Sequence, residues 1–438
     1  MLQTDLALSR QSWYAEGVTR PPVHPPLQGE VRAEVAVVGG GLAGLSAALE
    51  LAQRGRSVVV LEGHQLGWAA SGRNGGQALP GLACDMAEIE AQLGLGDARR
   101  VWAMTVEALT LIHARRDRHR IACDWQSGAL TVAVNARKTR ALRAWVDRMA
   151  EVYDYRQQWL DKAALPLHIR SPRFDSGVYD RRSGHLHPLK YTLGLANAVW
   201  QNGVRMHESS RVTALERHRS VTLLRTAQGQ VMADQVLLAG NVHLPGIAGL
   251  PASPGARIMP VGTYVAVTEP LQPERMDALL PTRAAVCDNN FSLDYFRPTA
   301  DQRLLYGGKV SYSTVTPPNL AARMRSHVAR TFPSLAHTPI THAWGGFVDI
   351  TMNRAPEFLR LPADGAASAP IYLLQGFSGH GLALTGLAGK LVAEAICGDA
   401  GRFDVFSRLR HRPFPGGERL RTPSLVLGML WYRLRDLL

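Results

Sequence analysis

Three glycines, Gly39, Gly41 and Gly44, have the GxGxxG spacing of a loop that holds the pyrophosphate of a dinucleotide. In such a loop the first glycine allows a tight turn, the second lets the backbone reach the phosphates, and the third lets a helix pack near the strand. The helix would begin at Leu42 and Ala43, where free N–H groups and the positive dipole end attract phosphate. The chemistry that this pattern predicts is dinucleotide binding.

Glu62 stands 18 residues after Gly44, where the acid that binds ribose hydroxyls is expected. The surrounding residues supply the elements that would position both groups. An apolar run at 33–38 predicts a strand, 42–54 predicts a helix that a glycine ends, and 57–61 predicts a second, valine-rich strand. The pattern is typical of a β-α-β unit with parallel strands, so the dinucleotide would be FAD or NAD.

The stretch ASGRNGGQ, residues 70–77, favours FAD over NAD. An NAD enzyme would normally continue its alternating strands and helices here, whereas a glycine-rich loop can wrap a planar ring and offer it N–H donors. A flexible linker is the alternative, although such linkers rarely combine arginine, asparagine and glutamine. The candidate cofactor-binding residues of this loop are Ser71, Gly72, Arg73, Asn74, Gly75, Gly76 and Gln77.

A second glycine-rich turn, QGFSGHGLALTG, lies near the end of the chain. Gly376, Gly379 and Gly381 would shape the turn, and a helix would begin near Leu382. A helix N-terminus beside a flavin would stabilise the negative charge of the reduced ring. His380 could add a hydrogen-bond donor there or serve only as a turn residue, and the sequence leaves both roles open.

The composition suits a globular protein of two domains. The chain has 438 residues, of which 46% are hydrophobic and 19% charged. Its net charge of +13 forms no stripe interleaved with aromatic residues, so nucleic acid is not an expected partner. Four widely spaced cysteines suit a reducing compartment, and the sequence shows neither a signal peptide nor a long apolar span, so we expect a cytoplasmic location. His185 and His187 are expected at a strand end, and no metal is expected.

Ten stretches of the chain, in order and at compatible spacing, carry a resemblance to a known family. The chain resembles the D-amino-acid-oxidase-like FAD amine oxidases, and among them the gamma-glutamylputrescine oxidases most closely. One stretch, AWGGFVDITMNR at 343–354, departs from the family's pattern near the expected substrate site. The ten stretches are SWYA, VVGGGLAGLSAALELA, ASGRNGGQ, CDWQSGAL, SGHLHPL, RTAQGQV, LLAGN, LDYFRPTADQRLLYGG, GFSGHG and RFDVFSRLRHRPFPGG.

The resemblance implies a bilobal α/β fold with a Rossmann-like FAD domain and a β-rich substrate domain. Glycine turns at both ends of the chain, with strand-rich sequence between them, agree with an FAD domain built from discontinuous segments. The expected segments are 1–30 for an N-terminal extension, 31–83, 176–248 and 341–400 for the FAD domain, 84–175 and 249–340 for the substrate domain, and 401–438 for a basic C-terminal tail.

The resemblance also implies oxidation of a small-molecule amine, most closely gamma-glutamylputrescine in polyamine catabolism. The amine would become an imine that hydrolyses to an aldehyde and ammonia, while molecular oxygen is reduced to hydrogen peroxide. We expect the FAD to be non-covalent because residues 343–376 contain no cysteine. Val212 is assigned to the FAD site. Lys309 and His380 are the catalytic candidates, with Lys309 either lowering the barrier to oxygen reduction or lying on the surface as an ordinary exposed lysine.

Hydride leaves only from a neutral amine, so the substrate site must disfavour the ammonium form. Aromatic walls would do this by desolvation, although each candidate could equally belong to the core. Arg297 and Arg73 could pair with a substrate carboxylate or form surface pairs with acids. The aromatic candidates are Tyr295, Phe296, Trp344 and Phe377.

The sequence leaves a second function open. A membrane-associated FAD dehydrogenase of D-amino acids or of sarcosine-like secondary amines would use the arginine-rich tail at 401–438 for peripheral membrane contact. Its electron acceptor would be a quinone instead of oxygen. An oxidase acting on D-amino acids, sarcosine or proline is a third reading within the same class.

Overall fold

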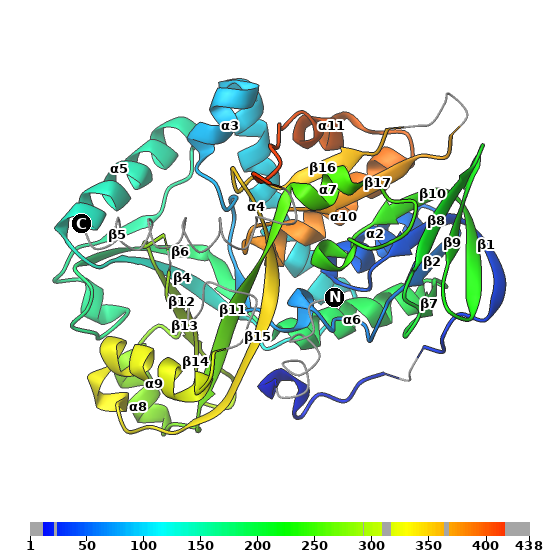
Figure 1. Ribbon diagram of the computed structural model, residues 1–438. Helices are drawn as coiled ribbons and strands as arrows, with labels where there is room; N and C mark the ends of the chain where they lie inside the picture. Colours follow the sequence, from blue (N-terminus) through cyan, green and yellow to red (C-terminus); the bar gives the residue numbers. More distant parts are fainter. Residues whose placement is uncertain (1–11, 22–23, 292, 309–316, 363–367, 417–438) are drawn as a thin grey trace.

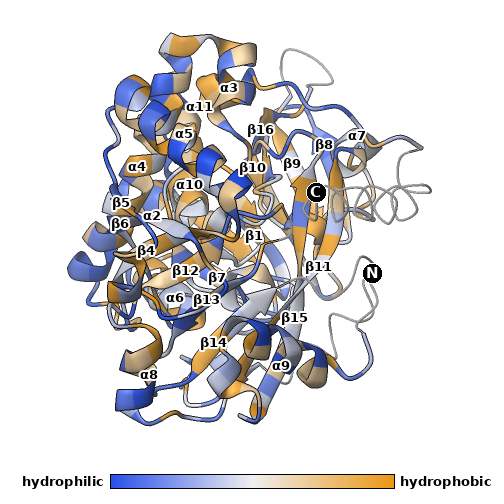
Figure 2. Cartoon of the chain, turned by 90° about the vertical axis from the view of Figure 1, so that its left-hand side faces the viewer, coloured by the Kyte–Doolittle hydropathy of each residue, from blue (hydrophilic) through white to orange (hydrophobic). Residues whose placement is uncertain are grey.

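The computed structural model describes residues 12–21, 24–291, 293–308, 317–362 and 368–416. Over these residues the chain is a mixed α/β fold with two sheets, one of eight strands and one of nine. Figure 1 shows the first sheet and its helices on the right of the view and most of the second sheet on the left. Apolar residues concentrate on the strands and on the inner faces of the helices, while polar residues cover the outer helices (Figure 2).

The first sheet has the strand order β16-β17-β10-β1-β2-β7, and its neighbours on this path run parallel except at β16. Its central strands are buried on both faces, which is why they read as unbroken apolar runs. A hairpin of β8 and β9 pairs antiparallel with β10. The strands are β1 (Gly29–Val38), β2 (Val58–Leu61), β7 (Arg205–His207), β8 (Ala214–His218), β9 (Val221–Arg225), β10 (Gly229–Leu238), β16 (Glu357–Arg360) and β17 (Ile371–Gln375).

Two glycine-hinged helices, α2 (Leu42–Gln53) and α10 (Gly381–Ile396), pack directly against each other beside the first sheet. At Gly389 of α10 a Cβ atom would lie 2.5 Å from the Ser46 Cβ and 2.6 Å from the Ala47 nitrogen, so this approach requires glycine. α4 (Leu95–Arg118) packs on α10, and α6 (Pro188–Gln201) packs on α2. The segments that start and nearly end the chain therefore share one core.

The second sheet has the order β15-β11-β14-β13-β12-β4-β6-β3, with β5 paired to β6. Its strands pair antiparallel except where β4 meets β12. One part of its core, around Phe296, Tyr306 and Phe332, is covered by α8 and α9. The strands are β3 (Gln77–Ala78), β4 (Gln126–Ala133), β5 (Gln158–Leu160), β6 (Ser176–His185), β11 (Ile258–Thr268), β12 (Ala285–Asp288), β13 (Tyr295–Pro298), β14 (Leu304–Gly308) and β15 (Ile340–Thr351).

The remaining described elements are short connections and outer helices. Among the described residues no single helix is both long and apolar enough to cross a membrane, and one sharply bent pair, α10 with α11, meets the criteria only when the two are joined. The elements are η1 (Trp13–Ala15), η2 (Ala70–Gly72), α3 (Met86–Leu93), α5 (Ala136–Tyr153), η3 (Leu165–Leu167), η4 (Asn241–His243), α7 (Ala252–Ala256), α8 (Pro273–Leu279), α9 (Leu320–Thr331), η5 (Pro333–Leu335) and α11 (Gly401–Ser407).

The mixed α/β fold class and the parallel β1–α2–β2 unit agree with the prediction from sequence. The domain boundaries stay a prediction. Three strands bear on them: β3, β6 and nearly all of β15 fall within segments expected for the FAD domain, and all three pair with strands of the second sheet.

Candidate active site

A cavity of about 1110 Å³ lies between the two sheets, and residues from both line it. The turns after β1, β2 and β17 contribute one side, which includes Gly39, Glu62 and Gly379. Strands of the second sheet contribute the other side, which includes Thr131 and Tyr295. The cavity therefore joins the predicted dinucleotide-binding turns to a wall of the second sheet.

Gly39 and Gly44 of the GxGxxG motif stand where the backbone leaves no room for a side chain. Gly39 has a φ of +114°, and a Cβ there would lie 2.6 Å from the Ala239 carbonyl oxygen. A Cβ at Gly44 would lie 2.0 Å from the Gly39 carbonyl oxygen, so this glycine serves the close packing of α2. Gly41 caps α2 and faces Ser71, whose Oγ would lie 2.8 Å from a Cβ at Gly41. This cradle fits a pyrophosphate at the start of α2.

The first residues of α2 and the side chain of Ser71 meet at the cradle. The Leu42 N–H donates to the Ser71 Oγ at 2.9 Å, which ties the 70–77 loop to the helix start. Leu42, Ala43, Gly41 and Ser71 all line the cavity. The structure thus brings two motifs into contact, because this hydrogen bond joins residues 29 positions apart in the sequence.

Glu62 lies at the end of β2 and lines the cavity, where the sequence predicts a ribose-binding acid. Its Oε2 accepts the Gly40 N–H at 2.7 Å and its Oε1 accepts the His64 N–H at 2.9 Å. Burial raises the pKa of Glu62 above its usual value, and the backbone donors partly offset that effect. Because a carboxylate can accept about four hydrogen bonds, further acceptor sites remain. Val212 lines the same cavity.

The 70–77 loop is held mainly by its own polar groups. Asn74 donates from Nδ2 to the Ala70 and Ser71 carbonyl oxygens, and its Oδ1 accepts the Gly76 N–H at 2.8 Å. Gln77 donates to the Val286 carbonyl oxygen of β12 at 3.0 Å. Of the loop candidates, Ser71, Asn74, Gly75 and Gln77 line the cavity, whereas Gly72, Arg73 and Gly76 lie behind them.

Arg73 connects the loop to β15 and does not line the cavity. Its Nε donates to the Trp68 carbonyl oxygen at 2.6 Å, and Nη1 donates to the Gly345 carbonyl oxygen at 3.2 Å. Trp344 of β15 makes a second contact with the loop, because its indole N–H donates to the Arg73 carbonyl oxygen at 3.0 Å. Trp344 is fully buried, so the structure places it in the core and not in the cavity wall.

Arg297 supports the loop from the opposite side. Its Nε donates to the Gly75 carbonyl oxygen at 2.6 Å, Nη1 to the Pro298 carbonyl oxygen at 3.2 Å, and Nη2 to the Tyr14 hydroxyl at 3.1 Å. Tyr14 in turn donates to the Asn74 carbonyl oxygen at 2.8 Å. Arg297 is 3% exposed and does not line the cavity, so the geometry favours loop support over the predicted contact with a substrate carboxylate.

Tyr295 and Phe377 are the two aromatic candidates that line the cavity, while Phe296 is fully buried in the core. Tyr295 lies between two glycines, because a Cβ at Gly75 would come within 2.4 Å of its ring and one at Gly307 within 2.0 Å. Burial raises the pKa of the Tyr295 phenol, so the hydroxyl is neutral. Side chains at either glycine would displace this ring from the wall.

The turn after β17 has the left-handed backbone conformation that its glycines predict. Gly376 has a φ of +77°, and a Cβ there would lie 2.5 Å from the Thr351 Cγ2. The Gly376 N–H donates to the Asp349 carboxylate, and the Ser378 N–H donates to the Asp349 carbonyl oxygen at 2.9 Å. The helix that follows begins at Gly381, one residue before the predicted start.

Asp349 is a buried carboxyl in the cavity wall that the sequence reasoning missed. It ends the apolar stretch GGFV of β15, within the region that departs from the family's pattern. Burial raises the pKa of Asp349 to about 6, and the N–H groups of the turn, including that of Gly376, act in the opposite direction. An acid that interrupts the apolar run GGFVDI was the signal that could have found it.

His380 lies at the start of α10 and lines the cavity. Its Nε2 lies 3.0 Å from the Pro80 carbonyl oxygen, and because a carbonyl only accepts, the hydrogen is on Nε2. Burial lowers the pKa of His380, so the ring is neutral and Nδ1 carries a lone pair. The ring thus has a free acceptor, whereas the sequence suggested either a donor or a turn residue.

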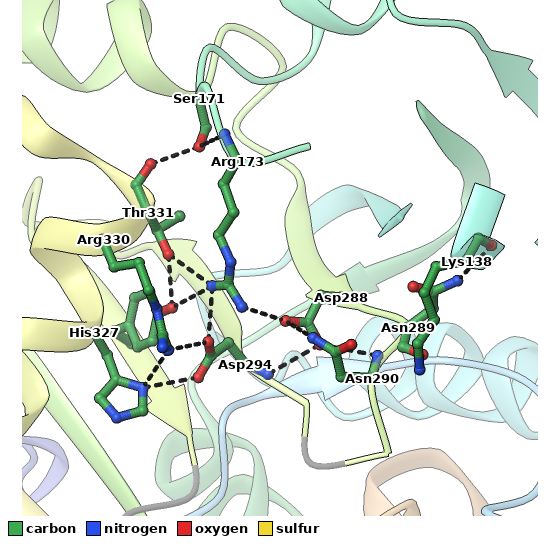
Figure 3. A network of polar contacts seen from close by, with 11 residues as sticks. Lys138, Ser171, Arg173, Asp288, Asn289, Asn290, Asp294, His327, Arg330 and Thr331 are labelled. Carbon is green, nitrogen blue, oxygen red and sulfur yellow. Dashed lines mark hydrogen bonds and ion pairs between the residues drawn. The ribbon is translucent and has the colours of Figure 1, made fainter. Parts of the chain in front are cut away.

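A buried polar network fixes the wall at residues 288–290 (Figure 3). Arg173 donates to the Asp288 carboxylate at 2.8 Å and lies 2.7 Å from the Asp294 carboxylate. His327 and Arg330 of α9 also contact Asp294, at 3.1 and 3.2 Å. Burial and the charge of Asp294 raise the pKa of Asp288 to about 6, and Arg173 acts in the opposite direction. The network joins this wall of the cavity to α9.

Lys309 lies outside the described residues, so its part in oxygen reduction stays a prediction. Its described neighbour Gly308, the last residue of β14, lines the cavity. His185 ends β6, as expected, whereas His187 caps α6 by accepting the Lys190 N–H.

Comparison with known proteins agrees with this site. The family model described as "DAO: FAD dependent oxidoreductase" matches residues 34–395. The chain is 39% identical to the gamma-glutamylputrescine oxidoreductase of Escherichia coli K12, over 97% of this chain and 98% of that one. It is 37% identical to a probable oxidoreductase OrdL of Haemophilus influenzae, over 97% of each chain.

Solved structures share the fold at low sequence identity. A glycine oxidase from Geobacillus kaustophilus superposes with a TM-score of 0.72 at 21% identity, over 87% of this chain and all of that one. An L-proline dehydrogenase from P. horikoshii superposes with a TM-score of 0.68 at 20% identity, over 84% of this chain and 94% of that one. The glycine cradle and the position of Glu62 agree with the family match. The chain therefore belongs to the FAD-dependent oxidoreductases of the D-amino-acid-oxidase type and is an FAD-dependent amine-oxidising enzyme.

Proposed function

We propose that this enzyme oxidises gamma-glutamylputrescine, or a closely related gamma-glutamylated amine, to the aldehyde in polyamine catabolism. The products would be the aldehyde, ammonia and hydrogen peroxide, with molecular oxygen as the electron acceptor. The observation that carries this proposal is the 39% identity to the E. coli gamma-glutamylputrescine oxidoreductase along nearly the whole of both chains. The cavity also has lining residues on strands of the second sheet, beyond the cofactor-binding turns.

The FAD would lie with its pyrophosphate at Gly39–Leu42 and its ribose at Glu62, and bound FAD supplies the two-electron chemistry. The protein's own contribution is to position the amine and keep it neutral. Tyr295 and Phe377 give the wall apolar surface, and desolvation there disfavours the ammonium form. The neutral His380 ring adds an acceptor at Nδ1 that can orient an N–H of the amine.

Oxidation of D-amino acids or of sarcosine-like secondary amines is the alternative, and its support is the fold shared with glycine oxidase and proline dehydrogenase. The test is peroxide release by the purified full chain with gamma-glutamylputrescine, putrescine, sarcosine and a D-amino acid panel. We expect kcat/KM to be highest for gamma-glutamylputrescine. A higher value for sarcosine or any D-amino acid would reject the proposal.

A cytoplasmic location belongs to the same proposal, and it is supported by four cysteines that are all unpaired. The tail thought to contact membranes lies mostly outside the described residues, at 417–438. Nothing in the names or folds of the relatives supports membrane contact for this chain. Electron transfer to oxygen is distinguished from transfer to quinone by comparing turnover in air with turnover in anaerobic buffer that contains a soluble quinone.

A further inference from the structure

One row of side chains crosses the second sheet along the floor of the cavity. Tyr295 pairs with Cys287, Cys287 with Thr131, and Thr131 with Val178, so these four residues share one face of β13, β12, β4 and β6. All four line the cavity. Two residues further along β6, on the same face, is Asp180, which also lines the cavity. The floor therefore ends at a carboxylate.

Asp180 is 6% exposed, and its shortest contacts are with neutral donors. Its Oδ2 accepts the Tyr155 hydroxyl at 2.5 Å and the Ser183 hydroxyl at 2.6 Å. Its Oδ1 accepts the Arg182 N–H at 3.0 Å, while the Arg182 guanidinium stays 3.9 Å away, stacks over the Tyr155 ring and is half exposed. Three donors leave room for a further hydrogen bond to the anion.

Gln157 adds a second acceptor next to Asp180. It precedes Gln158, which pairs with Tyr179, so Gln157 lies opposite Asp180 on the neighbouring strand edge. Its Oε1 is buried and has no hydrogen-bond partner among the described residues, and Gln157 lines the same cavity. A buried acceptor without a partner is costly in a native structure, and such a group points to a donor that arrives with a ligand.

Aromatic rings complete this end of the cavity. Trp102, Trp145 and Tyr155 line it, and Trp102 packs edge-to-face on Tyr155 at 5.0 Å between ring centroids. The indole N–H of Trp102 is buried without a partner in the described chain, and as a donor it requires an acceptor and not the ammonium itself. A carboxylate, a free amide oxygen and aromatic faces are the groups that proteins use to bind an ammonium ion.

The other buried acids of the cavity wall have different partners. Asp288 is paired with Arg173, as Figure 3 shows, and Asp349 accepts from the turn after β17. Glu62 accepts from two backbone N–H groups beside the glycine cradle. Asp180 differs because it lies at the far end of the floor, next to an acceptor that has no partner.

We propose that Asp180 and Gln157 form a subsite for a second, non-reacting ammonium group of the substrate. This proposal rests on the proposed function, in which that group is the α-ammonium of the gamma-glutamyl head. The reacting amine cannot bind here, because a carboxylate neighbour stabilises the ammonium form that resists oxidation. Tyr295 and Asp180 lie three strand spacings apart along the floor, which is about 15 Å. The two amine nitrogens of extended gamma-glutamylputrescine are about 12 Å apart, a comparable distance.

The first test uses the wild-type holoenzyme and a substrate pair. Glutarylputrescine keeps the reacting amine and the carboxylate of gamma-glutamylputrescine but lacks the α-ammonium. We expect kcat/KM for it to be roughly 10- to 100-fold lower, mainly through KM, because one charged hydrogen bond is lost. Equal kcat/KM for the two compounds would overturn the subsite.

The second test removes the charge of Asp180 while keeping an acceptor. Asp180→Asn is expected to bring kcat/KM for the two substrates within about threefold of each other, by lowering only the value for gamma-glutamylputrescine. Asp175→Asn is the matched control, because Asp175 precedes β6, pairs with Lys162 at 2.9 Å and does not line the cavity. A preference that survives in Asp180→Asn, in protein with full flavin content, would reject the role of Asp180.

Binding separates this proposal from the proposed function. The flavin absorbance change on anaerobic titration reports binding of both compounds to the wild-type protein and to Asp180→Asn. If gamma-glutamylputrescine binds more tightly than glutarylputrescine only when Asp180 is present, the subsite holds even where turnover is absent and the proposed function fails. Equal binding of the two compounds, or no binding of either, would overturn the subsite.

Discussion

Asp349 is a buried acid in the cavity wall that makes the stability of the folded protein depend on pH. Its carboxylate accepts the Gly376 N–H, which fixes the turn that leads into α10. Burial raises its pKa to about 6, so the folded protein retains a proton that the unfolded chain would release near pH 4. The folded state therefore loses stability as the pH rises between about 4 and 6, and above that range the cost of the buried anion is fully present.

Asp349→Asn should remove this pH-dependent cost. Relative to wild type, the variant should gain about 3 kcal/mol of stability between pH 4 and pH 6.5, since each unit of pKa shift is worth about 1.4 kcal/mol. The measurement is the melting temperature of both proteins across this range, and the informative quantity is the slope of their difference. Parallel curves would show that Asp349 titrates in the folded protein as it does in the unfolded chain.

Residue roles were predictable where they depend on neighbours in sequence, and not where they depend on distant ones. Gly39, Gly41 and Glu62 lie in the cavity wall because the strand, turn and helix that position them are encoded locally. Arg297 and Trp344 were given substrate roles, but each contacts the 70–77 loop, more than 200 residues away in sequence. The sequence around Arg297 or Trp344 contains no pattern that would predict a contact with a residue so far away in the chain.

At the scale of elements, α10 packs on α2 at a contact that leaves no room for a side chain at Gly389. Both helices begin in the cavity wall, at Leu42 and Gly381, so any separation of the two also moves the cofactor-binding turns. Gly389 permits the contact, because the atoms that face it are the Ser46 Cβ and backbone atoms of Ala43 and Ala47, which cannot rotate away.

Gly389→Val should therefore destabilise the protein by about 3 kcal/mol and lower its flavin content, since overpacking forces the helices apart. Gly96→Val is a matched control, because Gly96 lies in α4 and nothing stands within 4 Å of a Cβ there. The measurements are melting temperature and the ratio of flavin to protein absorbance. Because valine is a better helix former than glycine, Gly96→Val should cost little, and equal losses in both variants would refute the packing argument.

The order of the second sheet could not be read from the sequence. Its strands were recognisable as β-like runs, but β4 lies beside β12 although about 150 residues separate them, and their pairing is parallel. Such pairings depend on the collapse of the whole domain and have no turn chemistry to specify them. The same distance explains why Asp180 and Tyr295, on β6 and β13, were not expected to share one floor.

At the scale of the whole molecule, the cavity contains two thiols that bear on how the flavin is held. Of the four cysteines, Cys84 and Cys287 line the cavity. Burial raises the pKa of Cys84 to about 12 and that of Cys287 to about 11. Both therefore stay protonated near neutral pH, and the thiol is a poor nucleophile compared with the thiolate.

We expect one FAD per chain, bound without a covalent link. Acid precipitation of the purified yellow protein should leave all the flavin in the supernatant and none in the pellet. Absorbance of the two fractions at the flavin maximum is the measurement. Flavin in the pellet would identify a covalent bond, and Cys84→Ser and Cys287→Ser would then show which thiol forms it.

The glycine cradle lies near the start of the chain and the turn at 376–381 lies near its end, yet both line one cavity. Because a protein is synthesised from its N-terminus, the glycine cradle is made long before the 376–381 turn that forms another part of the cavity wall. Complete enclosure of the cofactor must wait until α10 has left the exit tunnel and packed on α2. The wall formed by the 376–381 turn is therefore added late in synthesis, long after the glycine cradle.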